Sequence, residues 1–270
     1  FTSKTILRIG VALLGMRIGW GQIQALGWEP IAMVVAIVAA TIGFGVALSR
    51  VMGFNPLFGF LSGGATAICG ASAALALAAA LPANDKKEQA TLFTVIGVSV
   101  FSTLAMIAYP MLTRWAGLDD HAAGIFIGAT IHDVAQVVGA GYAISPDAGD
   151  TATIVKLVRV AMLLPVIIVA GQITRSQSAG EGPRPPLLPW FVVAFAVLVV
   201  LNSVVAIPAS VSEGVNGLSK WCLVMAIAAI GMKTRLGEMA KLGIRPIALM
   251  LVETVFIAAL VLGILKSGLL

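Results

Sequence analysis

The residues best suited to chemistry lie in a short polar block, Thr130-Ile-His-Asp-Val-Ala-Gln136, inside an otherwise apolar stretch. His132 and Asp133 are adjacent, and Gln136 follows His132 by four residues, which places it on the same face of a helix. Ionisable side chains inside a membrane segment are costly and tend to mark an ion pathway or proton relay. Because histidine titrates near physiological pH, the imidazole beside the carboxylate could carry protons. The alternative is a buried polar network that only stabilises the fold.

A second block is rich in small and hydroxyl-bearing residues and reads GGATAICGASA over residues 63–73. A glycine-rich interruption of a helix at membrane depth would expose backbone N–H groups, which bind anions with help from the helix dipole. Thr66 and Ser72 would add hydroxyl donors, Cys69 a weak thiol donor, and Gly70 a flexible backbone position. Close packing of small residues between helices is the competing interpretation.

Two cations, Lys156 and Arg159, are three residues apart and therefore share one face of a helix. Turned inward, they would supply the positive field that an anionic substrate needs, and the planar guanidinium suits an oxyanion. Near a membrane surface they would only extend toward lipid headgroups. Glu253, in the last apolar segment, is left open between lining a pathway and contacting another helix.

The elements that position these residues must be membrane helices. Hydrophobic residues make up 59% of the 270-residue chain and charged residues 11%, whereas soluble domains carry about 25% charged residues. Uncharged runs long enough to cross a roughly 30 Å hydrocarbon core recur along the chain, namely Pro30–Ser49, Val51–Asn84, Gln89–Thr113 and Pro185–Ser212. These runs are too long and too uniformly apolar for barrel strands. The sequence therefore predicts an all-α, polytopic transmembrane bundle in contact with the lipid bilayer.

Spanning helices are expected near residues 4–20, 29–50, 89–113, 152–174, 188–207, 217–234 and 245–265. Two further segments, 55–82 and 122–145, are rich in small residues and are predicted to be interrupted or re-entrant helices. If both segments return to the side from which they entered, most cationic loops share one face and the acidic loops share the other. Positive loops mark the cytoplasmic side, so the net charge of +5 indicates membrane topology and not nucleic-acid binding.

An internal repeat appears when the chain is shifted by 216 residues. Residues 12–32 then align with residues 228–248 without a gap, with nine identities in 21 positions. We interpret residues 1–270 as one transporter domain with inverted-repeat copies around 7–33 and 223–249, an arrangement common in secondary transporters. A weaker echo, at a shift of 64, aligns Gly64-Ala-Thr66 with Gly128-Ala-Thr130.

Enzyme and cofactor signatures are absent from the sequence. It contains no Gly-x-Ser-x-Gly, no His-Glu-x-x-His and no phosphate-binding Gly-x-x-x-x-Gly-Lys motif. The two cysteines, Cys69 and Cys222, give neither a disulfide framework nor metal-ligand spacing. We therefore expect no enzyme activity, cofactor or metal, and keep an intramembrane hydrolase using Ser72 or Cys69 with His132, or a purely structural subunit, as remote alternatives.

The blocks Gly-Ala-Thr-Ala-Ile-Cys-Gly-Ala-Ser (64–72) and Gly-Ala-Thr-Ile-His-Asp-Val-Ala-Gln-Val-Val (128–138) resemble the signature of the YeiH-like membrane proteins, which are called sulfate exporters by association. The segments 143–148 and 156–160 continue the resemblance, which covers essentially the whole chain. Members usually carry further N-terminal helices, so the resemblance implies that Phe1 is a truncation point. The family looks related to cation/proton antiporters and bile-acid symporters, which implies a two-domain, elevator-like transporter of a bacterial inner membrane.

We therefore predict a secondary active transporter that exports a small inorganic oxyanion, sulfate or sulfite, with a proton or sodium as coupling ion. A cation/proton antiporter, with Asp133 as ion ligand and Lys156 as counter-charge, is the alternative. Among partners we count the anion, the coupling ion and a second copy of the chain as a homodimer. The predicted substrate-binding residues are Thr66, Cys69, Gly70, Ser72, Thr130, His132, Asp133, Gln136, Lys156 and Arg159.

Overall fold

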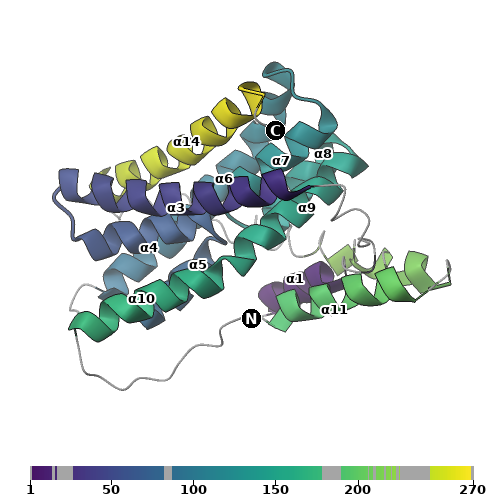
Figure 1. Cartoon of the computed structure of the whole chain (residues 1–270), viewed down its shortest axis with the longest axis horizontal. Coiled ribbons are helices and arrows are strands. Elements are labelled where there is room, and N and C mark those ends of the chain that lie inside the picture. The colour runs from purple at the N-terminus through teal and green to yellow at the C-terminus, as the bar shows by residue number, and fades with distance from the viewer. Residues whose placement is uncertain are drawn as a thin grey trace.

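The computed structural model describes residues 2–13, 16, 27–81, 87–177, 190–205, 207–208, 211–215, 217–219, 221–222, 225 and 244–268. Within these residues every regular element is a helix, which confirms the predicted all-α fold (Figure 1). In chain order the helices are α1 (Thr2–Leu13), α3 (Trp28–Val51), α4 (Pro56–Ala67), α5 (Ala71–Ala80), α6 (Lys87–Trp115), α7 (Asp120–Thr130), α8 (Val134–Ile144), α9 (Pro146–Ala161), α10 (Leu163–Gln177), α11 (Trp190–Val204) and α14 (Ile244–Lys266).

Four stretches of helix are long and apolar enough to cross a membrane, and they match four predicted spans: Trp28–Val51, Gln89–Trp115, Pro146–Ile173 and Ile244–Lys266. The third stretch is broken at Met162, between α9 and α10. Pro165 explains the break, because proline has no N–H for the carbonyl four residues earlier and its ring crowds that carbonyl. Of the other predicted spans, α11 covers most of 188–207 and α1 covers the start of 4–20.

The first small-residue segment is a helical hairpin, α4–α5, with its turn at Ile68–Gly70. Gly64 of α4 lies against the side chain of Leu77, although residues 13 apart would be about 20 Å apart in a continuous helix. Ala65 packs in one cluster with Ala74, so the two helices run antiparallel. The segment therefore enters the bundle and returns to the end from which it came.

The second small-residue segment is also a hairpin, α7–α8, with its turn at Ile131–Asp133. Helix α7 runs parallel to α9, because the Cα atoms of Gly124 and Gly128 face Thr151 and Val155 in that order. Helix α8 runs antiparallel to α9. Gly141, near the end of α8, faces Gly149 near the start of α9, whereas His132, just before α8, accepts from Lys156 in the second half of α9. Antiparallel α7 and α8 confirm the prediction of a second interrupted helix.

The two hairpins enter the bundle from opposite ends (Figure 1). Helix α14 runs antiparallel to α3, since Phe44 stacks on Phe256 while Met52 packs near Ile247. The end at which the α4–α5 hairpin opens therefore carries the cations Arg50, Lys87 and Arg245. The opposite end carries Asp119, Asp120, Asp147 and Asp150 together with Arg114 and Lys266. This distribution agrees with the predicted charge asymmetry.

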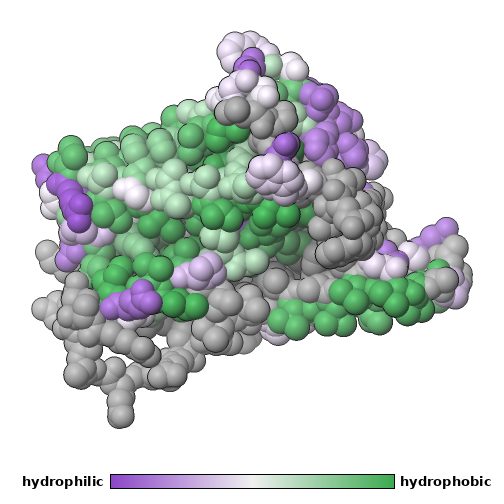
Figure 2. All heavy atoms as spheres, viewed as in Figure 1, coloured by the Kyte–Doolittle hydropathy of each residue, from purple (hydrophilic) through white to green (hydrophobic). Residues whose placement is uncertain are grey.

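The surface of the bundle divides in the same way. Apolar side chains cover its long flank, and hydrophilic residues gather at the two ends (Figure 2). Helices α1 and α11 pack on each other beside the bundle (Figure 1). Of the proposed inverted-repeat copies, 7–33 lies partly and 223–249 largely outside the described residues, so that repeat and the span at 217–234 stay predictions.

Candidate functional site

The turns of the two hairpins meet inside the bundle, and we call residues 68–70 and 131–133 together the turn junction. Gly70 has a φ of +62°, in the left-handed region that favours glycine, and this conformation lets the chain reverse between α4 and α5. A Cβ atom on Gly70 would lie 3.5 Å from the carbonyl oxygen of His132, so the two turns are in contact. The two small-residue segments, which supply most of the predicted substrate-binding residues, therefore meet at their turns.

Both α4 and α7 end at the turn junction, where their last carbonyl groups lack partners within the helix. Such groups are costly in a membrane interior unless another donor reaches them. Lys156 of α9 supplies these donors: its ammonium group donates to the carbonyl oxygens of Ile68 at 2.6 Å, Ile131 at 2.9 Å and His132 at 2.7 Å. A lysine ammonium has three donors, so these bonds use all of them.

Arg159, one turn further along α9, binds the ends of the same two helices. Its Nε donates to Ala67 O at 2.7 Å and its Nη2 to Thr66 O at 2.8 Å, both on α4. Its Nη1 donates to Gly128 O at 3.0 Å and Ile131 O at 3.1 Å, at the end of α7. The side chains of Lys156 and Arg159 are fully buried, which confirms their inward orientation. Their predicted role in substrate binding stays a prediction; all three donors of Lys156 and four of the five of Arg159 bind backbone carbonyls.

The other two helices, α5 and α8, begin at the turn junction and direct their positive N-terminal ends toward it. Asp133 caps α8, since its Oδ1 accepts from Ala135 N at 2.8 Å, and Asp133 N donates to Ser102 Oγ of α6 at 3.0 Å. The start of α5, at Gly70, has no side-chain cap. The junction therefore presents one capped and one uncapped helix N-terminus.

The remaining predicted site residues differ in their burial and in their hydrogen-bond partners. Gln136 is buried; its Nε2 donates to Thr103 Oγ1 at 2.9 Å, and its Oε1 has no hydrogen-bond partner. Ser72 is exposed on the first turn of α5, whereas the Cys69 thiol is buried. Thr130 Oγ1 donates to Phe126 O of its own helix at 2.6 Å, which directs this hydroxyl to the backbone.

Glu253 is the residue whose place the sequence left open. It is fully buried in the middle of α14, and its Oε1 accepts from Ser62 Oγ at 2.8 Å and its Oε2 from Thr66 Oγ1 at 3.4 Å. It is the single acidic residue of α14. That isolation in an apolar helix is the signal that could have selected it as a site residue.

His132 links the turn junction to the residue that follows Glu253. Its Nδ1 lies 3.1 Å from Thr66 O and its Nε2 lies 3.0 Å from Thr254 Oγ1. Because a carbonyl oxygen can only accept, Nδ1 carries a hydrogen. The Thr254 hydroxyl lies within reach of both His132 and Met250 O, and it can donate to only one of them at a time. His132 and Glu253 thus contact the same residue, Thr66, from two sides.

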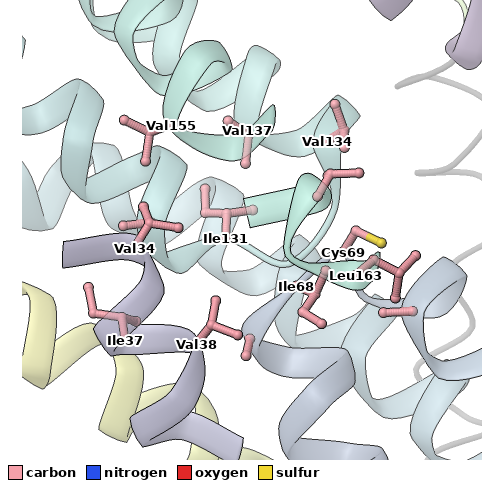
Figure 3. Close-up of a cluster of buried hydrophobic side chains, with 14 of the residues drawn as sticks. Val34, Ile37, Val38, Ile68, Cys69, Ile131, Val134, Val137, Val155 and Leu163 are labelled. Carbon is pink, nitrogen blue, oxygen red and sulfur yellow. The ribbon is translucent and has the colours of Figure 1, made fainter. Parts of the chain in front are cut away.

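Apolar side chains cover most of the turn junction, whereas Asp133 is half-buried. Figure 3 shows Ile68 and Ile131, one from each turn, among Val34 and Ile37 of α3 and Val155 of α9. Ile68 and Ile131 are each completely buried. Electrostatic interactions are stronger in such surroundings than in water, so the junction's charges act on any ligand that comes near.

Comparison with known proteins places the chain in a family. A family model described as "Conserved hypothetical protein 698" matches residues 1–250. The chain belongs to this family. A UPF0324 membrane protein of Chlorobaculum tepidum is 55% identical over 265 residues, which cover 97% of this chain and 74% of that protein. The UPF0324 membrane protein TauZ of Paracoccus denitrificans is 52% identical over 264 residues, which cover 97% of this chain and 78% of TauZ.

These matches confirm the resemblance to the YeiH-like proteins. Together with the four helices that could cross a membrane, they show that the chain is a multi-pass membrane protein. No solved structure matches the chain.

Proposed function

We propose that this membrane protein is a secondary active transporter that exports a small inorganic oxyanion such as sulfate or sulfite, with a proton or sodium as coupling ion. One observation carries the proposal: two interrupted-helix hairpins enter from opposite ends and meet at a buried pair of cations. Secondary transporters place their sites where interrupted helices meet within the membrane. Irregular backbone at this depth is tolerated where it is buried in protein or lines a substrate cavity.

The positive field at the turn junction supports an anionic substrate. The positive charges of Lys156 and Arg159 stand against about half a negative charge from each helix end that they bind and against the Asp133 carboxylate. The N-termini of α5 and α8 add about half a positive charge each, so a net positive potential remains. The anion would bind beside the exposed Ser72 and the uncapped start of α5, attracted by the two cations without direct contact with them.

The other readings gain no support from the geometry. As a cation/proton antiporter the protein would use Lys156 as the counter-charge of Asp133, but the hydrogen bonds of Lys156 go to three carbonyl oxygens. As a hydrolase it would need His132 hydrogen-bonded to Ser72 or Cys69. In the described residues His132 contacts Thr66 and Thr254 instead.

Purified protein in proteoliposomes tests the proposal, with uptake of labelled sulfate and sulfite measured under imposed pH and sodium gradients. We expect anion flux that a gradient of one of these ions stimulates. Ser72→Ala should raise the KM for the anion, while the control Ser267→Ala, at the exposed end of α14, should not change it. Cation flux without any anion would favour the antiporter, and cleavage of a peptide or ester would favour the hydrolase.

A further inference from the structure

Glu253 occupies a site that the proposed anion path does not use. Its carboxylate lies between α3 and α4, where glycines leave room for it: a Cβ atom on Gly45 would lie 2.6 Å from Oε1. Hydroxyl groups of Ser62 and Thr66 contact the two carboxylate oxygens. No Lys, Arg or His forms an ion pair with Glu253 in the part of the chain that the structure describes.

A buried carboxylate without a cation is expensive in a membrane interior, so this group must hold a proton or bind a metal cation. A sodium ion would need several free oxygen ligands. The backbone carbonyls at the end of α4, those of Thr66, Ala67 and Ile68, already accept from Arg159, His132 and Lys156. A proton needs only one further acceptor, and the Thr66 hydroxyl lies beside Oε2.

We propose that Glu253 is the proton-binding carboxyl group of the transporter, and that its protonation state changes the attachment of the α4–α5 hairpin to α14. This inference rests on the proposed transport function for its coupling role, but not for proton binding itself. When ionised, the carboxylate accepts from both Ser62 and Thr66. When protonated on Oε2, it donates through that oxygen, and the Thr66 hydroxyl turns and accepts.

The change would be transmitted through Thr66. Its hydroxyl contacts Glu253, while its carbonyl oxygen accepts from Arg159 and His132 at the turn junction. A proton on Glu253 thus alters the residue that the junction cations hold in place. This is a route by which proton uptake could change the affinity for an anion bound at the N-terminus of α5.

Few ionisable groups face Glu253 from the helices packed against α14, which are α3, α4, α6 and α7. Helix α4 contains none. Those of α3, α6 and α7 are Tyr109, which packs on Phe126, and a set near the helix ends, namely Glu29, Arg50, Lys87, Glu88, Arg114, Asp120 and His121. The turn junction and α9 contribute His132, Arg159, Lys156, Asp133 and Cys69. His132 and Arg159 reach Thr66 directly, so they are the groups whose charge would influence proton binding.

Infrared spectroscopy tests proton binding without any transport. Wild-type protein should show the carbonyl-stretching band of a buried, protonated carboxylic acid, and this band should disappear as pH rises. Glu253→Gln should remove the band, whereas Glu29→Gln, a matched change at an exposed position on α3, should keep it. Glu253→Asp, which retains an ionisable group, should change the pH at which the band disappears. This variant provides the test if Glu253→Gln does not fold.

Flux in proteoliposomes tests the coupling role. Glu253→Gln should reduce pH-driven anion transport to the level seen without a gradient and leave anion exchange at equal pH. A band that persists in Glu253→Gln, or a wild-type dependence of flux on pH in this variant, would overturn the proposal. The proposal would also be overturned if Asp133→Asn abolished pH-driven flux while Glu253→Gln kept it. Loss of the carboxylic-acid band on addition of sodium at constant pH would overturn it too. If wild type shows the band but transports no anion, proton binding stands and the transport function fails.

Discussion

Replacing Lys156 by methionine separates a structural role of this cation from a substrate-binding role. Methionine has a similar length but no donor, so the carbonyl oxygens of Ile68, Ile131 and His132 would lose the hydrogen bonds that they accept at 2.6–2.9 Å. These bonds join the two hairpin turns to α9. We therefore expect the variant to loosen the turn junction whether or not an anion is present.

The magnitude follows from the buried carbonyl groups of Ile68 and His132, because Ile131 O keeps the bond that it accepts from Arg159 Nη1. Each one left without a donor costs about 1–3 kcal/mol, and removing one partner of a buried charged contact typically costs about 3–5 kcal/mol. We take about 3 kcal/mol as the lower bound, because some carbonyls can find other donors after relaxation. For a domain of this size, this corresponds to a fall in apparent unfolding temperature of about 6–12 °C.

The assay combines thermal unfolding in detergent with labelling of Cys69, which is buried at the turn junction. In a Cys222→Ser background, Lys156→Met should unfold at lower temperature and react faster with a maleimide. Lys266→Met, at the exposed end of α14, is the matched control and should behave as wild type. Unchanged stability and labelling together with weaker anion binding would refute the reasoning, because the ammonium would then be a substrate ligand.

Three further outcomes are expected. Gly59→Ala should sharply lower the yield of folded protein, because the new methyl group would collide with the α3 backbone, whereas Gly43→Ala, which faces open space, should be tolerated. Asp133→Ala should lower the free energy of unfolding by about 1 kcal/mol through loss of the α8 cap, and Asp133→Asn should largely retain it, as thermal unfolding would show. Spin labels at Asn55 and Ala143, at the open ends of the two hairpins, should keep a constant separation when anion is added.

The sequence predicted the main features of the fold because they depend on local composition. Long apolar runs give spanning helices, and segments in which glycine, alanine and hydroxyl residues replace large side chains allow close packing and a turn at membrane depth. The expected helical face shared by His132 and Gln136 is wrong, because His132 lies in the turn before α8 and the two side chains contact different residues. Charge placement further indicated that both segments return to their own side, because cationic and acidic loops are otherwise mixed.

The contacts of the site could not be predicted in the same way. The spacing of Lys156 and Arg159 shows that they share a helix face, but it does not show which backbone carbonyls lose their helical partners nearby. That depends on where α4 and α7 end in space. Glu253 meets Ser62 and Thr66 across 191 and 187 residues of chain, so only the packing of α14 against α4 brings the three together.

Lys156 and Arg159 are shared between the two hairpin turns, and this limits the motions that could expose the site. Each of them binds both hairpin turns from α9, and neither can leave one turn without exposing a buried carbonyl. Separating the hairpins from each other would therefore cost several such groups at once, about 1–3 kcal/mol for each carbonyl. Moving both hairpins together with α9 past the neighbouring helices breaks none of these bonds. Alternating access in this protein should therefore proceed by movement of this unit as a rigid body, with the turn junction intact throughout.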